Sequence, residues 1–249
     1  MRLRLLLCAA ALLAACTPES EAPAEETNAG TGGVAAKRIP LPDCSTVETQ
    51  DLGADGWKHP DCRTMLTDNS GLAVEARYTR AEDESTKVSA QVVAPGDATL
   101  QTIEETMGNT FNQISVQDID KDGKADLLLP LETGNVNTTW AVWRQQDDGK
   151  SFVRIGEPSG IEIVKTASGY FAVPSRSSAN EWDVAFYKLE ANALQPVVTA
   201  SIVAQGEVDK ITGVECSVTD DGGLAQTGLD PAVAKAQFCA EPSVAEIFK

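Results

Sequence analysis

Histidine is almost absent from this sequence, and cysteine pairs of the Cys-x-x-Cys kind are missing. The only histidine, His59, stands beside Pro60 in what we expect to be a loop. A Ser-His-Asp triad and a histidine-ligated zinc hydrolase both depend on well-placed histidines, so neither can be assembled here. A pair of carboxylates acting on a glycosidic bond stays open among so many acidic residues, although nothing singles out one pair. We therefore expect a protein that is not an enzyme.

The sequence also lacks a hydrophobic run long enough to span a bilayer. Arg2 and Arg4 precede an uncharged apolar stretch over residues 5–13, whereas a spanning helix needs roughly 20 residues. A basic start followed by a short apolar core is typical of a secretory signal. We predict that residues 1–15 are a cleaved export signal.

Leu13-Ala14-Ala15-Cys16 resembles the lipobox of bacterial lipoproteins. This resemblance implies that Cys16 carries diacylglycerol and becomes the first residue of the mature protein. Its acyl chains would hold the protein on a membrane, because each buried methylene contributes about 0.8 kcal/mol. Thr17 follows, and not the Asp that signals inner-membrane retention in enterobacteria. We expect a lipid-anchored protein of the cell envelope, on the outer membrane and facing the periplasm.

Large apolar side chains are scarce over residues 16–38, which are rich in Pro, Glu, Ala, Gly and Thr. Such a composition cannot bury enough surface to offset chain entropy, which predicts a flexible tether. Residues 39–249 remain and are long enough for one domain with a core or for two small ones. We predict a single β-rich domain.

Basic residues are few. The chain has 20 Lys and Arg against 37 Asp and Glu, a net charge of −17, and losing Arg2 and Arg4 with the signal leaves 18 against 37, or −19. A field of this sign repels nucleic acid and anionic lipid and suits cations and basic partners. A surface charged only for solubility is the alternative. We expect no nucleic-acid partner.

Four cysteines remain once the signal and the lipidation site are set aside: Cys44, Cys62, Cys216 and Cys239. An even number in an exported chain predicts disulfides, with three possible connectivities. We favour Cys44 to Cys62 and Cys216 to Cys239, since each pairing closes a short local loop. A zinc site is the weaker alternative, because no Cys-x-x-Cys pair exists.

Hydrophobic and polar residues alternate over 72–79, which is the period-two pattern of a half-buried strand. Similar runs recur between turn residues: 87–93, 113–118, 125–131, 138–144, 151–155, 170–174, 182–189 and 196–204. Residues 100–108 fit a helix or a strand, and we favour a strand. The connections are too short for βαβ crossovers. The pattern predicts an all-β fold, an antiparallel meander arranged as a sandwich, a barrel or a propeller-like assembly.

One short helix is expected near the C-terminus. Asp230 can cap a helix that Pro231 opens and residues 232–240 continue. A disulfide between Cys239 on this helix and Cys216 would fasten it to the end of the last strand. The tryptophans of the predicted strands are expected in the core rather than on a ligand-binding surface: Trp140, Trp143 and Trp182.

The sharpest motif is an acidic loop between two predicted strands, residues 118–126. Three carboxylates at every second position, a glycine for a sharp turn, a main-chain carbonyl and a further carboxylate match positions 1, 3, 5, 7 and 9 of a calcium loop. The expected Ca²⁺ ligands are Asp118, Asp120, Asp122, Lys124 through its carbonyl, and Asp126. Gly123 should adopt a conformation closed to residues with a Cβ. Leu129 replaces the bidentate Glu of position 12, and a solvated acidic turn without metal is the alternative.

This strand-loop-strand form resembles the D-x-D-x-D-G-x-x-D loops of FG-GAP and VCBS-type repeats, which fix strand geometry around Ca²⁺ in integrin-like propellers and many bacterial surface proteins. A single copy is visible, at 118–126. A complete seven-bladed propeller is therefore not supported.

Residues 87–205 resemble, in layout, a family of Xanthomonas-type lipoproteins that serve as immunity proteins against lysozyme-like toxins delivered by type IV secretion. The layout is a strand, an acidic D-x-D-x-D-G loop, an apolar strand, aromatic hairpins and a final apolar strand. The aromatic residues are Trp140, Trp143, Phe152, Phe186 and Tyr187. The resemblance implies a binding or inhibitor module for a cationic lysozyme-like peptidoglycan hydrolase. A structural envelope lipoprotein, in which Ca²⁺ only stabilises the fold, is the alternative.

Overall fold

The computed structural model describes residues 40–83, 85–207 and 210–248. Its contacts divide the chain after Arg38, and Ile39–Lys249 forms one compact unit. The predicted signal, the lipidation of Cys16 and the tether fall outside the described residues. Within the described part, no helix has the length and apolar character needed to cross a membrane.

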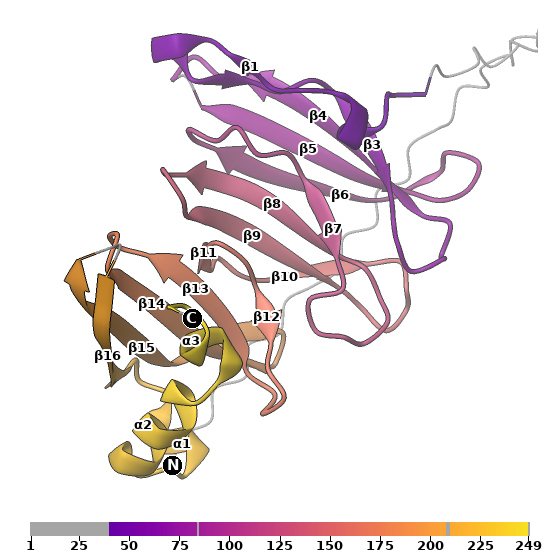
Figure 1. Ribbon diagram of the computed structural model, residues 1–249. Helices are drawn as coiled ribbons and strands as arrows, with labels where there is room; N and C mark the ends of the chain where they lie inside the picture. The colour runs from indigo at the N-terminus through magenta and orange to yellow at the C-terminus, as the bar shows by residue number, and fades with distance from the viewer. Residues whose placement is uncertain (1–39, 84, 208–209, 249) are drawn as a thin grey trace, which may run out of the picture. The chain divides into compact units, whose positions relative to one another are not determined.

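The described residues form antiparallel sheets that follow one another along the chain (Figure 1). A two-stranded ribbon consists of β1 (Gln50–Asp51) and β2 (Trp57–Lys58). The first sheet consists of β3 (Cys62–Met65), β4 (Ala73–Arg80), β5 (Thr86–Val93) and β6 (Thr99–Met107). The middle sheet consists of β7 (Ser115–Gln117), β8 (Asp126–Thr133), β9 (Thr138–Gln145), β10 (Phe152–Gly156) and β11 (Ser159–Gly160). The last sheet consists of β12 (Val164–Lys165), β13 (Phe171–Arg176), β14 (Glu181–Glu190), β15 (Ala193–Glu207) and β16 (Lys210–Asp220).

Short helices complete the described chain. Two 3-10 turns, η1 (Cys44–Thr46) and η2 (Gly53–Asp55), flank β1. Three α-helices close the sequence: α1 (Leu224–Thr227), α2 (Pro231–Cys239) and α3 (Pro242–Ala245). The predicted all-β antiparallel meander with a C-terminal helix is confirmed.

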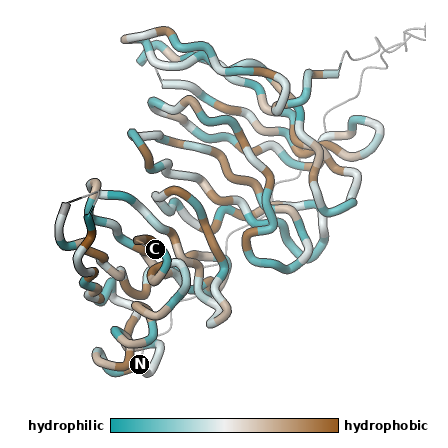
Figure 2. Tube along the Cα trace, in the orientation of Figure 1, coloured by the Kyte–Doolittle hydropathy of each residue, from teal (hydrophilic) through white to brown (hydrophobic). Residues whose placement is uncertain are grey.

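The middle sheet is buried on both faces, and β8 shows why. Leu127 and Leu129 belong to the core shared with the first sheet, whereas Leu128 belongs to the core shared with the last sheet. Successive side chains of a strand point to opposite faces, so a strand covered on both sides needs a continuous apolar run. Figure 2 shows the contrast with other strands, where hydrophobic and hydrophilic positions alternate.

A third core joins the last sheet to the C-terminal helices. Phe186 of β14 and Phe238 of α2 are fully buried there, with ring centroids 4.8 Å apart. Asp230 caps α2 as predicted, accepting from the backbone N–H groups of Ala232 and Val233. The N-cap therefore sets the start of this helix, and packing against the last sheet stabilises it.

The structure differs from the predicted elements at the C-terminal end. The strand β16 was not among the predicted runs. Val214, Cys216 and Val218 alternate with polar residues, but the alternation is short and most side chains of the strand are exposed. Pairing with β15 along its length holds it in the sheet. The single-turn helices α1 and α3 are too short for helical periodicity to show. The three tryptophans Trp140, Trp143 and Trp182 are half-buried and pack against the cores.

Candidate metal centre

The acidic loop connects β7 to β8, and its own carboxylates shape it. The two carboxylate oxygens of Asp118 accept hydrogen bonds from the backbone N–H groups of Asp122 at 3.1 Å and Gly123 at 3.0 Å. Asp120 accepts a further bond from the N–H of Asp122 at 3.2 Å. Gly123 has a φ of +86°, in the left-handed region that glycine adopts without steric cost. The prediction that Gly123 adopts a conformation unfavourable for residues with a Cβ is confirmed by this φ angle.

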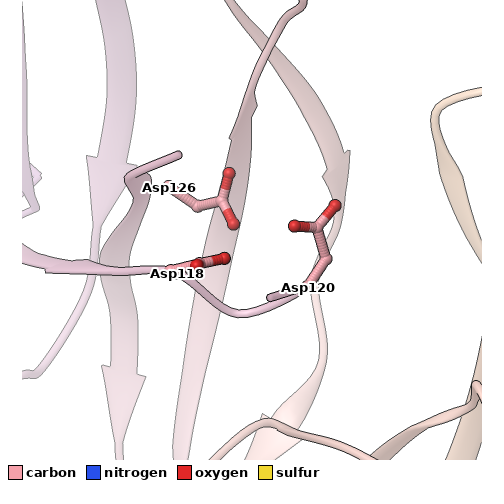
Figure 3. Close-up of side chains that lie close together, drawn as sticks. All are labelled: Asp118, Asp120 and Asp126. Carbon is pink, nitrogen blue, oxygen red and sulfur yellow. The ribbon is translucent and has the colours of Figure 1, made fainter. Parts of the chain in front are cut away.

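Three carboxylates converge at this loop: Asp118, Asp120 and Asp126. One ligand oxygen from each lies within 4.8 Å of the others (Figure 3). Asp120 is 4% exposed and Asp126 is 1% exposed, whereas Asp118 faces solvent. The three side chains therefore form a partly buried acidic cluster that is exposed to solvent at Asp118.

Asp126 is held in place by main-chain donors at the start of β8. One of its oxygens accepts from the N–H of Gln145 at 3.0 Å and the other from the N–H of Ile119 at 3.2 Å. The buried side chain of Gln145 accepts from Ala125 N at 3.1 Å and donates to the carbonyl of Gly149 at 3.1 Å. Gln145, at the end of β9, therefore fastens the loop to the neighbouring strand.

The electrostatic state of Asp126 differs from that of an ordinary carboxylate. Burial raises its pKa to about 7, and the carboxylates of Asp120 and Asp122 act in the same direction. The hydrogen bonds from Gln145 and Ile119 oppose this shift without cancelling it. A cation placed among the carboxylates would favour the ionised form of Asp126.

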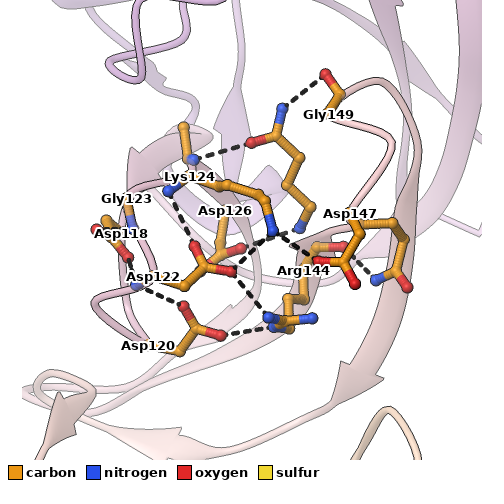
Figure 4. Close-up of polar contacts among 12 residues, drawn as sticks. Asp118, Asp120, Asp122, Gly123, Lys124, Asp126, Arg144, Asp147 and Gly149 are labelled. Atoms are coloured by element: carbon orange, nitrogen blue, oxygen red, sulfur yellow. Dashed lines mark hydrogen bonds and ion pairs between the residues drawn. The ribbon is translucent and has the colours of Figure 1, made fainter.

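Asp122 and Lys124 lie in a second network beside the cluster (Figure 4). One oxygen of Asp122 accepts from the backbone N–H of Lys124 at 2.9 Å. The other contacts Lys124 Nζ at 3.3 Å and Arg144 Nη2 at 2.8 Å. Burial alone would raise the pKa of Asp122, but the hydrogen bonds and charges of Lys124 and Arg144 hold it below its usual value. Lys124 Nζ also pairs with Asp147 at 2.8 Å.

Arg144 links the two groups of carboxylates. Its Nε lies 2.6 Å from Asp120 Oδ2, and its Nη2 reaches Asp122. Sequence reasoning missed Arg144 and Gln145, which lie at the end of β9, the second strand after the loop. The sequence pattern carried no signal for either, since an arginine and a glutamine at the end of a strand are ordinary.

The donor set fits a hard cation. The converging atoms are all carboxylate oxygens, which suit Ca²⁺ and do not suit soft metals. Asp118, Asp120 and Asp126 would hold the ion, and Asp120 would share its carboxylate with Arg144. Asp122 would join them only by giving up its contacts with Lys124 and Arg144. Such an ion would supply charge neutralisation and strand fixation.

The four cysteines predicted to form disulfides are joined in two pairs. The structure contains the disulfides Cys44–Cys62 and Cys216–Cys239, the pairing that the local spacing favours. The first joins η1 to the start of β3, and the second joins the edge strand β16 to the end of α2. Neither disulfide contributes to the metal centre.

Comparison with known proteins gives a structural similarity but no sequence match. No protein-family model matches the chain, and no curated protein matches it. The chain is similar to a solved structure of a Xanthomonas type IV secretion system related protein, with a TM-score of 0.45 and 11% sequence identity. That similarity covers 74% of this chain and 97% of the other.

Proposed function

We propose that this protein is a lipid-anchored envelope protein whose β domain binds Ca²⁺ at residues 118–126 and acts as a binding or inhibitor module without catalysis. The observation that carries the proposal is the convergence of Asp118, Asp120 and Asp126 on one point. Burial and repulsion from neighbouring carboxylates raise the pKa of Asp126, which shows that its ionised form is disfavoured. A divalent cation among the carboxylates would offset this electrostatic cost.

The proposed ion has a structural consequence. Asp118 follows β7, Asp126 begins β8, and Gln145 ties Asp126 to β9. A cation among these carboxylates would join strands of the middle sheet, which contributes side chains to both neighbouring cores. This geometry also favours the second candidate function, a structural envelope lipoprotein in which Ca²⁺ only stabilises the fold.

Calcium should raise the thermal stability of the protein. At a free concentration 100 times the dissociation constant, binding to the native state alone contributes about 2.7 kcal/mol. For a domain of this size that corresponds to a rise in Tm of about 5 to 10 °C. Differential scanning calorimetry in calcium and in chelator measures the rise, and equal melting temperatures would contradict the proposal.

Variants of the loop test which of the carboxylates predicted from the motif spacing bind the ion. Asp120→Ala should abolish the calcium-dependent rise in Tm, because it removes one of the converging ligand oxygens, which Asn would keep. Asp122→Ala should reduce it less, because Asp122 lies outside the converging group of Asp118, Asp120 and Asp126. Asp55→Ala is the matched control, because Asp55 is exposed in η2 and makes no hydrogen bond or ion pair with residues 118–126 among the described residues. Its rise in Tm should equal that of the wild type.

Inhibition of a cationic peptidoglycan hydrolase tests the binding module. The net charge of the mature chain is strongly negative, and complementary fields accelerate association with a basic partner. The mature protein should slow cell-wall lysis by a cognate lysozyme-like enzyme, and added salt should weaken the effect because it screens surface charge. No inhibition across a panel of muramidases from the same organism and its competitors would leave the structural role in place.

The lipid anchor has its own test. Cys16→Ser removes the residue that the lipobox pattern marks for acylation, so the variant should lose its acyl label and leave the membrane fraction of the native host. A variant at Cys8, within the signal, should behave as the wild type does. Retention of the Cys16→Ser protein with its label would show that another segment holds it to the membrane.

A further inference from the structure

Arg144, near the end of β9, places its guanidinium group against the acidic loop (Figure 4). Its Nε lies 2.6 Å from Asp120 Oδ2, and its Nη2 lies 2.8 Å from Asp122 Oδ2. The side chain of Arg144 is 17% exposed, so solvent and salt screen its charge only in part. A cation that belongs to the protein therefore contacts two of the carboxylates that the motif predicts as calcium ligands.

The contacts of Arg144 explain why Asp122 lies outside the converging group. The motif spacing predicts a ligand at this position, yet the carboxylate of Asp122 is not among those that converge. Its Oδ2 is held by Arg144 and by Lys124 Nζ at 3.3 Å, and its Oδ1 accepts from the backbone N–H of Lys124. Hydrogen bonds between charged partners are roughly twice as strong as neutral ones. Arg144 thus retains a potential calcium ligand away from the cluster.

Asp120 has contacts that fix its position independently of Arg144. Its carbonyl oxygen accepts a hydrogen bond from Lys165 Nζ of β12, in the last sheet. Its Oδ1 accepts from the backbone N–H of Asp122 at 3.2 Å. The main chain and one carboxylate oxygen of Asp120 are therefore held by other groups. Removal of the guanidinium would leave Asp120 in place and free its Oδ2 for a metal ion.

We propose that Arg144 is a built-in competitor of Ca²⁺ that sets the affinity of the acidic loop. The inference rests on the proposed calcium site and concerns the regulation of that site. In the calcium-free protein the guanidinium stabilises the ionised carboxylates of Asp120 and Asp122. When Ca²⁺ binds, the same positive charge repels the ion and retains Asp122, and both effects weaken binding. A residue that only positioned the carboxylates would act in the opposite direction, since its loss would lower the affinity.

Calorimetric titration of Ca²⁺ into the chelator-stripped, full mature chain tests the proposal with Arg144→Met, which keeps an unbranched side chain and removes the charge. Arg144→Met should bind Ca²⁺ about tenfold more tightly than the wild type, because one positive charge beside the divalent ion is lost. In chelator its Tm should be lower by at least about 5 °C, because buried Asp120 loses its counter-ion. The calcium-dependent rise in Tm should therefore be larger than in the wild type.

Arg154→Met is the matched control, on the neighbouring strand β10. Arg154 pairs with the largely buried Glu105 and, within the described part of the chain, forms no ion pair or hydrogen bond with residues 118–126. This variant should also lower the Tm in chelator but should leave the dissociation constant for Ca²⁺ unchanged. Arg144→Lys keeps a positive charge without the planar fork of the guanidinium, so its affinity should lie between those of the wild type and Arg144→Met.

Asp122→Ala completes a double-mutant cycle with Arg144→Met. In the wild-type background it should weaken calcium binding by less than about threefold. In the Arg144→Met background it should weaken binding by about tenfold, because Asp122 is then free to reach the ion. Equal effects of Asp122→Ala in the two backgrounds would contradict the proposed retention of Asp122 by Arg144.

The affinities distinguish failure of this inference from failure of the calcium site. Binding by the wild type together with equal or weaker binding by Arg144→Met would overturn the role of Arg144 and leave the calcium site in place. Absence of heat from the wild type and from the Arg144 variants alike would refute both. Circular dichroism establishes that Arg144→Met is folded. If it is not, Arg144→Lys decides the question, and an affinity no higher than that of the wild type would overturn the inference.

Discussion

Phe238→Ala should lower the free energy of unfolding by about 3 to 5 kcal/mol, the cost of emptying a large buried aromatic site. Phe238 of α2 is 0% exposed and belongs to the core between this helix and the last sheet. Its ring contacts Phe186 of β14 and Tyr170 at centroid distances of 4.8 and 5.1 Å. A helix of nine residues is marginal in water without such packing, so its attachment to the sheet depends on this side chain.

Val233→Ala is the matched control on the same helix. Val233 is 47% exposed, and surface substitutions away from special features usually change stability by less than about 0.5 kcal/mol. Urea unfolding followed by circular dichroism measures both variants. Equal stability of Phe238→Ala and Val233→Ala would show that α2 is not part of the cooperative core.

The second large effect concerns the disulfide between Cys216 and Cys239. Its removal by Cys216→Ser with Cys239→Ser should cost about 3 kcal/mol, since the bond closes a loop with a sequence separation of 23. The bond joins the end of α2 to β16, whose side chains are mostly exposed and contribute little burial. Both elements should therefore loosen together.

Hydrogen exchange locates this effect. Amides of α2 and β16 should exchange faster in the double variant, whereas amides of the first sheet should keep their protection. Removing Cys44 and Cys62 in the same way is the matched comparison, because that disulfide has a similar sequence separation of 18. Its loss should affect η1 and β3 instead. Free thiols at Cys216 and Cys239 in peptide mapping of the wild type would contradict the account.

Burial explains which strands the sequence predicts well. Strands such as β5 and β13 expose or bury alternate side chains, or are covered on both faces, and their apolar residues mark them directly. β16 is held by main-chain hydrogen bonds and a disulfide at the edge of the last sheet. The apolar alternation of this strand is confined to Val214, Cys216 and Val218, and most of its side chains are exposed, so hydropathy marks it only weakly.

The acidic loop shows a similar limit for sites. Residue spacing predicts a carboxylate cluster because alternate residues of a turning loop face one side, and Asp118, Asp120 and Asp126 do converge. Spacing contains no information on a neighbouring strand, so the contacts of Arg144 with Asp120 and Asp122 could not be foreseen. A cation at this loop would therefore share the carboxylate of Asp120 with Arg144.

Calorimetric titration of Ca²⁺ into chelator-stripped protein tests the calcium centre most directly. The wild type should show one site with a dissociation constant on the order of 10⁻⁴ to 10⁻³ M, the range of extracellular modules. Asp120→Ala should abolish the heat of binding and Asp55→Ala should retain it. A wild type without heat of binding, and with the same melting temperature in calcium as in chelator, would show that residues 118–126 form an acidic turn without metal.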